Sequence, residues 1–221
     1  MLRFLDQVNA IVGMLLFLAY LYQVFYTLYG LAFCRRDRRK AARQTPAKPI
    51  RRYAALICAR NEESVIGELI SSLRAQDYPA ELLDIYVLAD NSTDATARVA
   101  RQAGAIAFER FNPYQVGKGY ALNELFSRIR SSRPLSDYDA FLVFDADNIV
   151  DSHFVSAMDR TFAQGYDVLT SYRNSKNFAS SWVSAGYSIW FLREARFLND
   201  PRMKLHTNCA ISGTGFLVSS K

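Results

Sequence analysis

The chain has 221 residues, 50% of them hydrophobic, so it can bury the core of one sizeable domain and still carry an appendage. Its formal net charge of +6 does not indicate a nucleic-acid-binding protein, because the excess lies in one short segment. Arg35 to Arg52 contain nine Lys or Arg against one Asp, a net +8, which leaves about −2 for the rest of the chain.

The amino-terminal segment is apolar over the length that a membrane requires. No charged residue occurs from Gln7 to Cys34, and roughly 20 apolar residues are enough for a helix to cross a bilayer. We predict a transmembrane helix over residues 9–33. Its many aromatic residues leave an interfacial helix as the alternative, whereas a cleaved signal peptide is disfavoured because the apolar region is too long.

Basic residues beside a membrane span stay in the cytoplasm and favour anionic lipids. The sequence therefore predicts a membrane segment (1–34), a basic cytoplasmic linker (35–52) and a cytoplasmic domain (53–221), in a single-pass protein of the cell membrane with its amino terminus outside. Cys34, Cys58 and Cys209 have no metal-ligand spacing and form an odd set, as expected in a reducing compartment.

The first strands of the domain are short apolar runs that end in polar turns. Residues 53–58 predict a buried strand, and a helix with apolar spacing follows the turn Ala59 to Glu63, with Asn61 as its N-cap. Residues 83–89 predict a second strand that ends at Asp90. Ser92 to Asp94 are residue types that begin a helix, and the start of the next helix is enough to explain them. Asp90 precedes this helix start, so the local structure gives no reason for a carboxylate there.

A weak third strand (105–108) leads into a polar loop in which Gly117 and Gly119 flank Lys118. Flanking glycines let a backbone approach a ligand, and a Lys at a helix start suits a diphosphate, although a plain loop explains this short pattern equally well. The helix that follows is predicted over residues 120–130.

The next apolar run, residues 140–144, predicts a strand buried on both faces, and it ends in Asp145 and Asp147. Residues i and i+2 of a strand point to the same side, so both carboxylates can reach one hard cation or its water shell. Asp137 and Asp139 have the same spacing, but they precede the strand and are interpreted as a solvated turn.

The remaining segments are a helix at 154–162, a strand at 167–172 and a strand at 209–218 that is broken by Gly213, Thr214 and Gly215. An uncharged run at 179–192 contains both tryptophans of the chain. It is too short to span a bilayer, and it either packs on the domain or lies in the membrane interface. His153 and His206 have no partner at metal-ligand spacing and are interpreted as structural.

The alternation of strands and helices predicts an α/β fold with a mainly parallel central sheet and helices on both faces. Asp90, Asp145 and Asp147 then share the carboxyl edge of the sheet, where such folds bind ligands. Neither a GxGxxG nor a GxxxxGK[ST] motif occurs. This interpretation requires Asp90 to lie within a nucleotide's length of Asp147, and it fails if either acid is buried in a dry interior against a basic partner.

These motifs resemble the family 2 glycosyltransferases over about residues 53 to 221, in their order and spacing: the Ala-Arg-Asn-Glu-Glu turn, the Asp before a Ser-Thr-Asp turn, the Gly-Lys-Gly loop with its Ala-Leu-Asn helix, and the Asp-x-Asp pair. The resemblance implies a GT-A fold and an inverting, metal-dependent transfer of a sugar from a UDP-sugar to a polysaccharide or lipid hydroxyl at a membrane. It places the nucleotide-sugar at Ala59, Arg60, Asn61, Glu62, Asp90, Lys118 and Asp145, Mg²⁺ or Mn²⁺ at Asp145 and Asp147, and the floor of the donor-sugar and acceptor site at Gly213, Thr214 and Gly215.

The family's carboxylate base usually lies in a Glu-Asp pair soon after the strand that ends near Val218. We therefore expect the base beyond Lys221, and expect these 221 residues to bind a donor with little turnover. Two alternatives remain: a sugar nucleotidyltransferase, which would normally carry a Gly-rich first turn, and an inactive membrane-tethered scaffold that retains the nucleotide site.

Overall fold

The computed structural model describes residues 2–33 and 51–221, and it divides them into two compact units, each considered by itself. One unit holds the amino-terminal helix and residues 172–210. The other holds residues 51–171 and 211–221, which form the sheet. The predicted basic linker lies outside the described residues except for Arg51 and Arg52.

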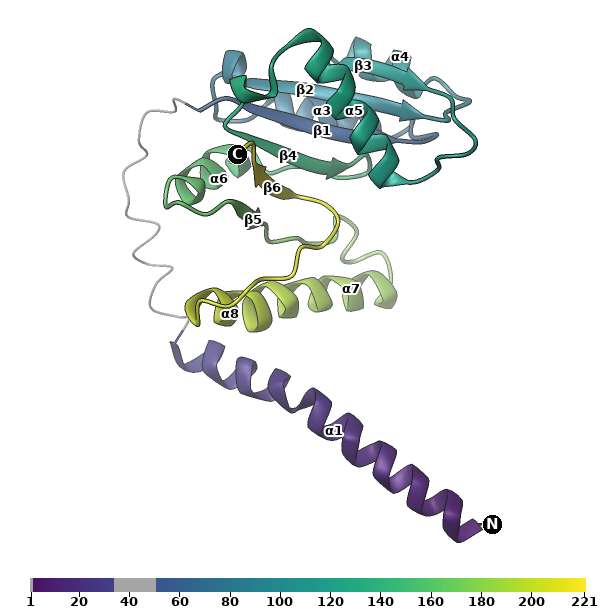
Figure 1. Ribbon diagram of the computed structural model, residues 1–221, viewed down its shortest axis with the longest axis vertical. Helices are drawn as coiled ribbons and strands as arrows, with labels where there is room; N and C mark the ends of the chain where they lie inside the picture. Colours follow the sequence, from purple (N-terminus) through teal and green to yellow (C-terminus); the bar gives the residue numbers. More distant parts are fainter. Residues whose placement is uncertain (1, 34–50) are drawn as a thin grey trace. The chain divides into compact units, whose positions relative to one another are not determined.

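The sheet unit is built on six strands in the order β3-β2-β1-β4-β6-β5 (Figure 1). The first four run parallel, whereas β6 is antiparallel to both of its neighbours. The mainly parallel α/β fold is thus confirmed, with an antiparallel pairing at one side. The strands are β1 (Tyr53–Ala59), β2 (Leu83–Asp90), β3 (Ile106–Arg110), β4 (Ala140–Asp145), β5 (Val168–Thr170) and β6 (Phe216–Ser219).

Helices cover both faces of the sheet. Alternate residues of β1 face opposite ways, so Ala55 and Ile57 pack with α3, α4 and α6, and Ala54 and Leu56 pack with α5. Burial on both faces explains why β1, β2 and β4 are nearly continuous apolar runs in the sequence. The elements are α3 (Ile66–Arg74), α4 (Thr96–Gln102), α5 (Lys118–Ser132) and α6 (Phe154–Phe162), with short 3₁₀ turns η1 (Ala80–Leu82) and η2 (Leu135–Asp137).

The amino edge of the sheet is occupied by structural ion pairs. Arg51 binds the buried Asp159 at 3.1 Å, and the Tyr53 hydroxyl donates to the same carboxylate at 2.7 Å. Arg52 binds Asp84 at 3.0 Å. These two arginines, predicted as part of the lipid-facing linker, therefore hold acids of the folded domain.

Two predicted local features differ from the structure. Asn61 does not cap α3, which begins at Ile66 after Val65; its backbone is in the left-handed region, with φ 55°. The broken strand at 209–218 is a strand only from Phe216 onward. Both predictions used local signals, and in both places contacts with distant segments determine the conformation.

The other unit consists of helices. The segments α7 (Trp182–Arg193), η3 (Glu194–Asn199, π-helical) and α8 (Asp200–Lys204) follow one another, and the last two pack on α1 (Leu2–Phe33). Pro201 has no N–H to donate to residue 197, and in a regular α-helix its ring would clash with that carbonyl, so the π-helical turn of η3 just before it relieves this conflict. Within the described residues, one helix is long and apolar enough to cross a membrane, at Arg3–Ala32.

Candidate active site

The carboxyl ends of β1, β2 and β4 bring the predicted site residues together. Cys58 of β1 is in register with Asp145 of β4, and Ala59 with Ala89 of β2, the residue before Asp90. With β1 between them, β2 and β4 lie two strand spacings apart, roughly 10 Å. Asp90 and Asp145 are thus within a nucleotide's length of each other.

Cys58 lies between these acids, but it does not supply a nucleophile. Burial raises the pKa of its thiol to about 12, an effect that Asp90 and Asp145 reinforce and Lys118 partly offsets. The thiol is therefore protonated at neutral pH, and it acts as a small apolar side chain in the floor of the site.

Lys118 joins two of the predicted motifs. Its ammonium group contacts Oδ1 of Asp145 at 2.5 Å and the carbonyl oxygen of Gly213 at 2.5 Å. Gly117, with φ 128°, turns the chain so that α5 begins at Lys118. The sequence pattern around Lys118 was a weak signal, but the structure places this lysine at the first carboxylate of the Asp-x-Asp pair. A diphosphate bound at this edge of the sheet would need such a cation.

The segment Gly213 to Gly215 is fixed against the end of β4. The backbone N–H of Asp145 donates to Oγ1 of Thr214 at 2.8 Å, and that hydroxyl donates to Oδ1 of Asn148. Gly213 and Gly215 have φ values of 55° and 65°, and a Cβ at Gly215 would lie 2.6 Å from Oγ of Ser171. The glycines are needed for the tight turn that brings this segment to the site.

Asp147 and Glu62 make this edge strongly negative. Asp147 is exposed, and its Oδ1 accepts a hydrogen bond from Asn148 at 3.2 Å. Burial raises the pKa of Glu62, and the charges of Asp147, Asp94 and Asp145 raise it further. Among the residues that the structure describes, no three acids, histidines or cysteines are grouped as metal ligands. Asp147 follows β4 in a turn, so the strand spacing that was expected to aim it to the same side as Asp145 does not hold there, and a metal site at these two carboxylates remains a proposal.

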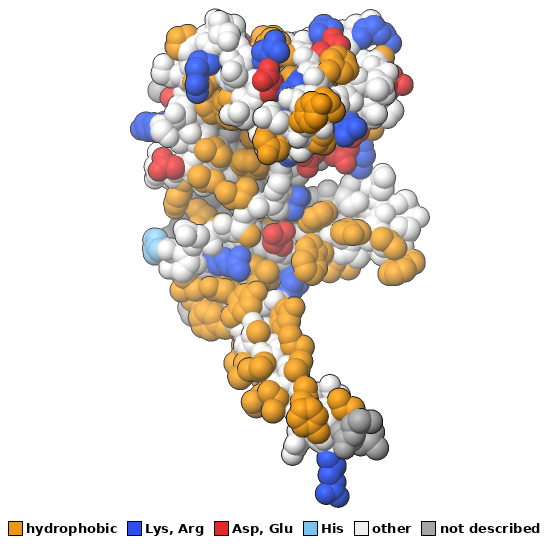
Figure 2. Space-filling model, turned by 45° about the vertical axis from the view of Figure 1, so that its right-hand side comes forward, with side chains coloured by type: hydrophobic (Ala, Val, Ile, Leu, Met, Phe, Trp, Pro, Cys, Tyr) orange, Lys and Arg blue, Asp and Glu red, His pale blue; other side chains and the backbone are white. Residues whose placement is uncertain are grey.

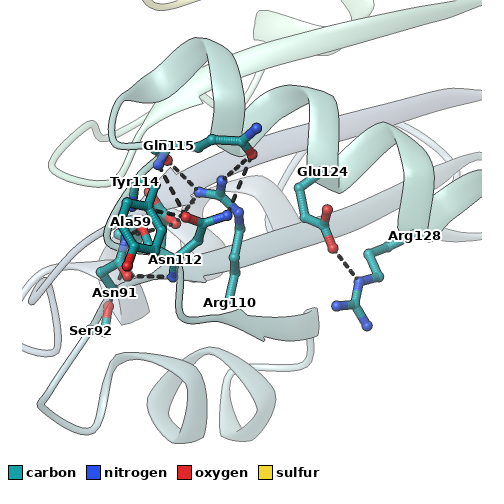
Figure 3. A network of polar contacts seen from close by, with 10 residues as sticks. Ala59, Asn91, Ser92, Arg110, Asn112, Tyr114, Gln115, Glu124 and Arg128 are labelled. Atoms are coloured by element: carbon teal, nitrogen blue, oxygen red, sulfur yellow. Dashed lines mark hydrogen bonds and ion pairs between the residues drawn. The ribbon is translucent and has the colours of Figure 1, made fainter.

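Asp90 occupies a different environment from the one predicted. It is 6% exposed, and its Oδ1 accepts a hydrogen bond from Arg110 at 2.7 Å. Arg110 also donates to the carbonyl of Gln115, and Asn91 and Asn112 complete the network (Figure 3). The requirement that Asp90 stay clear of a basic partner is therefore not met, and any contact of Asp90 with a base or ribose would be shared with Arg110.

Arg110 is the functional candidate that the sequence did not reveal. It ends β3 and is in register with Asp90 at the end of β2. The sequence does show a basic residue near the end of the third strand. Its position beside Asp90 could be predicted only if the pairing of β3 with β2 were already known.

The turn after β1 is bound to the turn after β2. Oδ1 of Asn61 accepts from the backbone N–H of Thr93 at 2.8 Å, and the N–H of Glu62 donates to Oγ1 of Thr96 at 2.8 Å. Ala59 is buried, whereas Arg60 is exposed. Of the four predicted pocket residues in this turn, Arg60 and Glu62 thus keep side-chain groups that can meet a ligand, and Asn61 orders the turn.

The chain is similar in sequence and in fold to known proteins. The family model described as "Glycosyltransferase like family 2" matches residues 49–221. A beta-monoglucosyldiacylglycerol synthase of Nostoc sp. PCC 7120 is 31% identical over 151 residues, which are 63% of this chain and 31% of that protein. A 4,4'-diaponeurosporenoate glycosyltransferase of Staphylococcus aureus is 52% identical over 50 residues, 23% of this chain and 12% of that protein.

Among solved structures, the mannosyltransferase PcManGT of Pyrobaculum calidifontis, in complex with GDP-Man and Mn²⁺, has a TM-score of 0.54 and 16% identity. The match covers 88% of this chain and 53% of that one, and at this identity it supports the fold alone. The chain spans about a third of the length of the glucosyldiacylglycerol synthase it matches.

Proposed function

Because the chain belongs to glycosyltransferase-like family 2, we propose that it is the membrane-anchored, donor-binding part of an enzyme that transfers a sugar from a UDP-sugar to a hydroxyl acceptor. The observation that carries this proposal is the convergence of Lys118, Asp145 and Gly213 at the carboxyl edge of the sheet. Three segments that are distant in the sequence meet there through the Lys118 ammonium group, the Asp145 carboxylate and the Gly213 carbonyl.

In the proposed complex, Arg60, Asn61, Glu62 and the Asp90–Arg110 pair would line the nucleoside pocket, and Lys118 would be drawn from Asp145 to the diphosphate. Gly213 to Gly215 would form the floor under the donor sugar. A Mg²⁺ or Mn²⁺ ion held by Asp145 and Asp147 would offset the charge of the diphosphate when it is bound. Without such a cation, the carboxylates around Glu62 would repel a donor.

The proposed reaction inverts the anomeric carbon. The acceptor oxygen forms a bond to that carbon as the bond to the UDP oxygen breaks, UDP leaves with the electron pair, and the hydroxyl proton passes to a carboxylate base. Glu194 is an acid of the described chain downstream of the Asp-x-Asp pair, but it is paired with Arg173 at 3.6 Å. We therefore do not assign the base to Glu194.

The acceptor that we propose is a membrane lipid, with a growing polysaccharide as the second candidate. The glucosyldiacylglycerol synthase is named for a lipid product, and α1 would hold the domain beside a lipid substrate. Membranes that contain the full-length protein should convert radiolabelled UDP-sugar into a product soluble in organic solvent. A product formed only from UTP and sugar phosphate would instead identify a nucleotidyltransferase, and no product from either substrate would favour the scaffold.

A further inference from the structure

The lysine at the start of α5 already supplies a cation to the Asp-x-Asp pair. Its ammonium group lies 2.5 Å from Oδ1 of Asp145 and 2.5 Å from the carbonyl oxygen of Gly213. The side chains of Lys118 and Asp145 are 34% and 46% exposed, so the ion pair is partly screened by water. A group of the protein itself therefore occupies one carboxylate of the proposed metal site.

The two acids of the pair differ in what they can offer a metal ion. Asp147 is exposed, and its carboxylate accepts a hydrogen bond from the side-chain amide of Asn148 at 3.2 Å. Asp145 already gives an oxygen to Lys118. Mg²⁺ gives up its waters reluctantly and usually needs substrate phosphates in addition to one or two carboxylates. A divalent cation should therefore bind weakly while Lys118 holds Asp145.

Lys118 is suited to leave Asp145 when a diphosphate arrives. Its ammonium group is a compact charge on a flexible stem of four carbons, so it can change partners while its Cα stays in place. Gly117, with φ 128°, fixes the start of α5 at this lysine, and the amino end of a helix also favours an anion. A diphosphate that takes the ammonium group leaves both carboxylates of the pair free.

The charges at this edge of the sheet oppose the entry of either ligand alone. Burial raises the pKa of Glu62, and the charges of three nearby acids raise it further: Asp147, Asp94 and Asp145. A diphosphate without a cation meets these negative charges. A cation without a diphosphate meets the ammonium group of Lys118 on its first ligand.

We propose that Lys118 keeps divalent cations off Asp145 until a diphosphate takes the lysine, so that the cation and the nucleotide-sugar bind as a pair. This inference rests on the proposed function and adds an order of events to it. Lys118 weakens the binding of the metal alone and strengthens the binding of the nucleotide. Because binding free energies are linked, each ligand raises the affinity for the other by the same factor.

Titration of Mn²⁺ without nucleotide tests the competition at Asp145. The full chain is kept in detergent, because α1 exposes apolar side chains along its length (Figure 2). The electron paramagnetic resonance signal of free Mn²⁺ measures binding, and Asp147→Ala identifies the part that belongs to this site. Lys118→Met should bind Mn²⁺ about fivefold more tightly than the unaltered chain, the upper end of the range for a partly exposed ion pair.

A matched variant separates competition from overall charge. Arg128 lies on the same helix and pairs with Glu124 at 2.7 Å. It is about 15 Å along α5 from Lys118 at 1.5 Å per residue, farther than the screening length of about 8 Å at physiological salt. Arg128→Met should therefore leave the Mn²⁺ affinity unchanged. No gain in Lys118→Met, or an equal gain in Arg128→Met, would overturn the proposal.

The same titration in saturating UDP tests the pairing of the two ligands. UDP should raise the Mn²⁺ affinity of the unaltered chain about fivefold more than that of Lys118→Met, because only the unaltered chain releases a lysine from Asp145. An equal rise in both proteins would overturn this inference while leaving the proposed function standing. Failure of the unaltered chain to bind UDP with Mn²⁺ would instead contradict the proposed function, and the pairing with it.

Discussion

Replacing Asp90 with Ala should weaken the sheet unit strongly, because it leaves the guanidinium of Arg110 buried without its anion. The two side chains are 9% and 7% exposed and 2.7 Å apart. Breaking such a pair from one side costs about 3–5 kcal/mol. For a domain of this size each kcal/mol lowers the thermal midpoint by roughly 2–4 °C, so a fall of at least about 6 °C is expected.

Chemical denaturation of the single and double variants measures this coupling. The variant with both Asp90→Ala and Arg110→Ala should be more stable than the sum of the two single losses predicts, by about 2 kcal/mol. Arg101 and Glu109 form a matched exposed pair at 2.8 Å, with side chains 49% and 45% exposed. Glu109→Ala should therefore change stability by less than about 1 kcal/mol. Equal effects of Asp90→Ala and Glu109→Ala would refute the buried pair.

Three further predictions concern single sites. Gly215→Ala combines φ 65° with a Cβ 2.6 Å from Oγ of Ser171, so it should destabilise by about 2 kcal/mol in thermal unfolding, and adding Ser171→Ala should restore part of the loss. Lys118→Met should change stability by less than about 1 kcal/mol, since its ion pair is partly exposed, yet weaken UDP binding in calorimetry by roughly tenfold or more. The hydrogen bond to Asp77 raises the pKa of His153 above 6.5. The stabilising contribution of this pair is therefore present below pH 6.5 and is lost as the pH rises through the raised pKa. NMR titration of His153 should show a midpoint above 6.5, and Asp77→Asn should return that midpoint toward 6.5.

The sheet and its ligand edge could be predicted because buried parallel strands leave a strong pattern. β1, β2 and β4 are buried apolar runs, whereas β3 is a weaker and largely exposed strand. Parallel strands align their carboxyl ends without further information. The position of Asp145 and Asp147 after such a run separated them from Asp137 and Asp139, which have the same spacing and precede β4.

The contacts between distant segments could not be predicted. The burial of Asp90 depends on the pairing of β2 with β3, which places Arg110 beside it. Asn61 has the composition of a helix cap, but its side chain binds the turn after β2 instead. Residues 172–210 group with α1, and one close approach in that contact is at Gly30, where a Cβ would lie 3.2 Å from Cγ of Pro201; nothing in the sequence distinguished this glycine.

The central claim, that the carboxyl edge of the sheet binds a nucleoside diphosphate through a divalent cation, is tested by titrating UDP into the full chain with and without Mn²⁺. Binding should require Mn²⁺ and should be lost in Asp147→Ala, whose exposed position leaves the fold intact. Asp137→Ala, an exposed acid with the same spacing at the opposite edge, should bind like the unaltered chain. Binding that is indifferent to Mn²⁺, or that survives Asp147→Ala unchanged, would contradict the account.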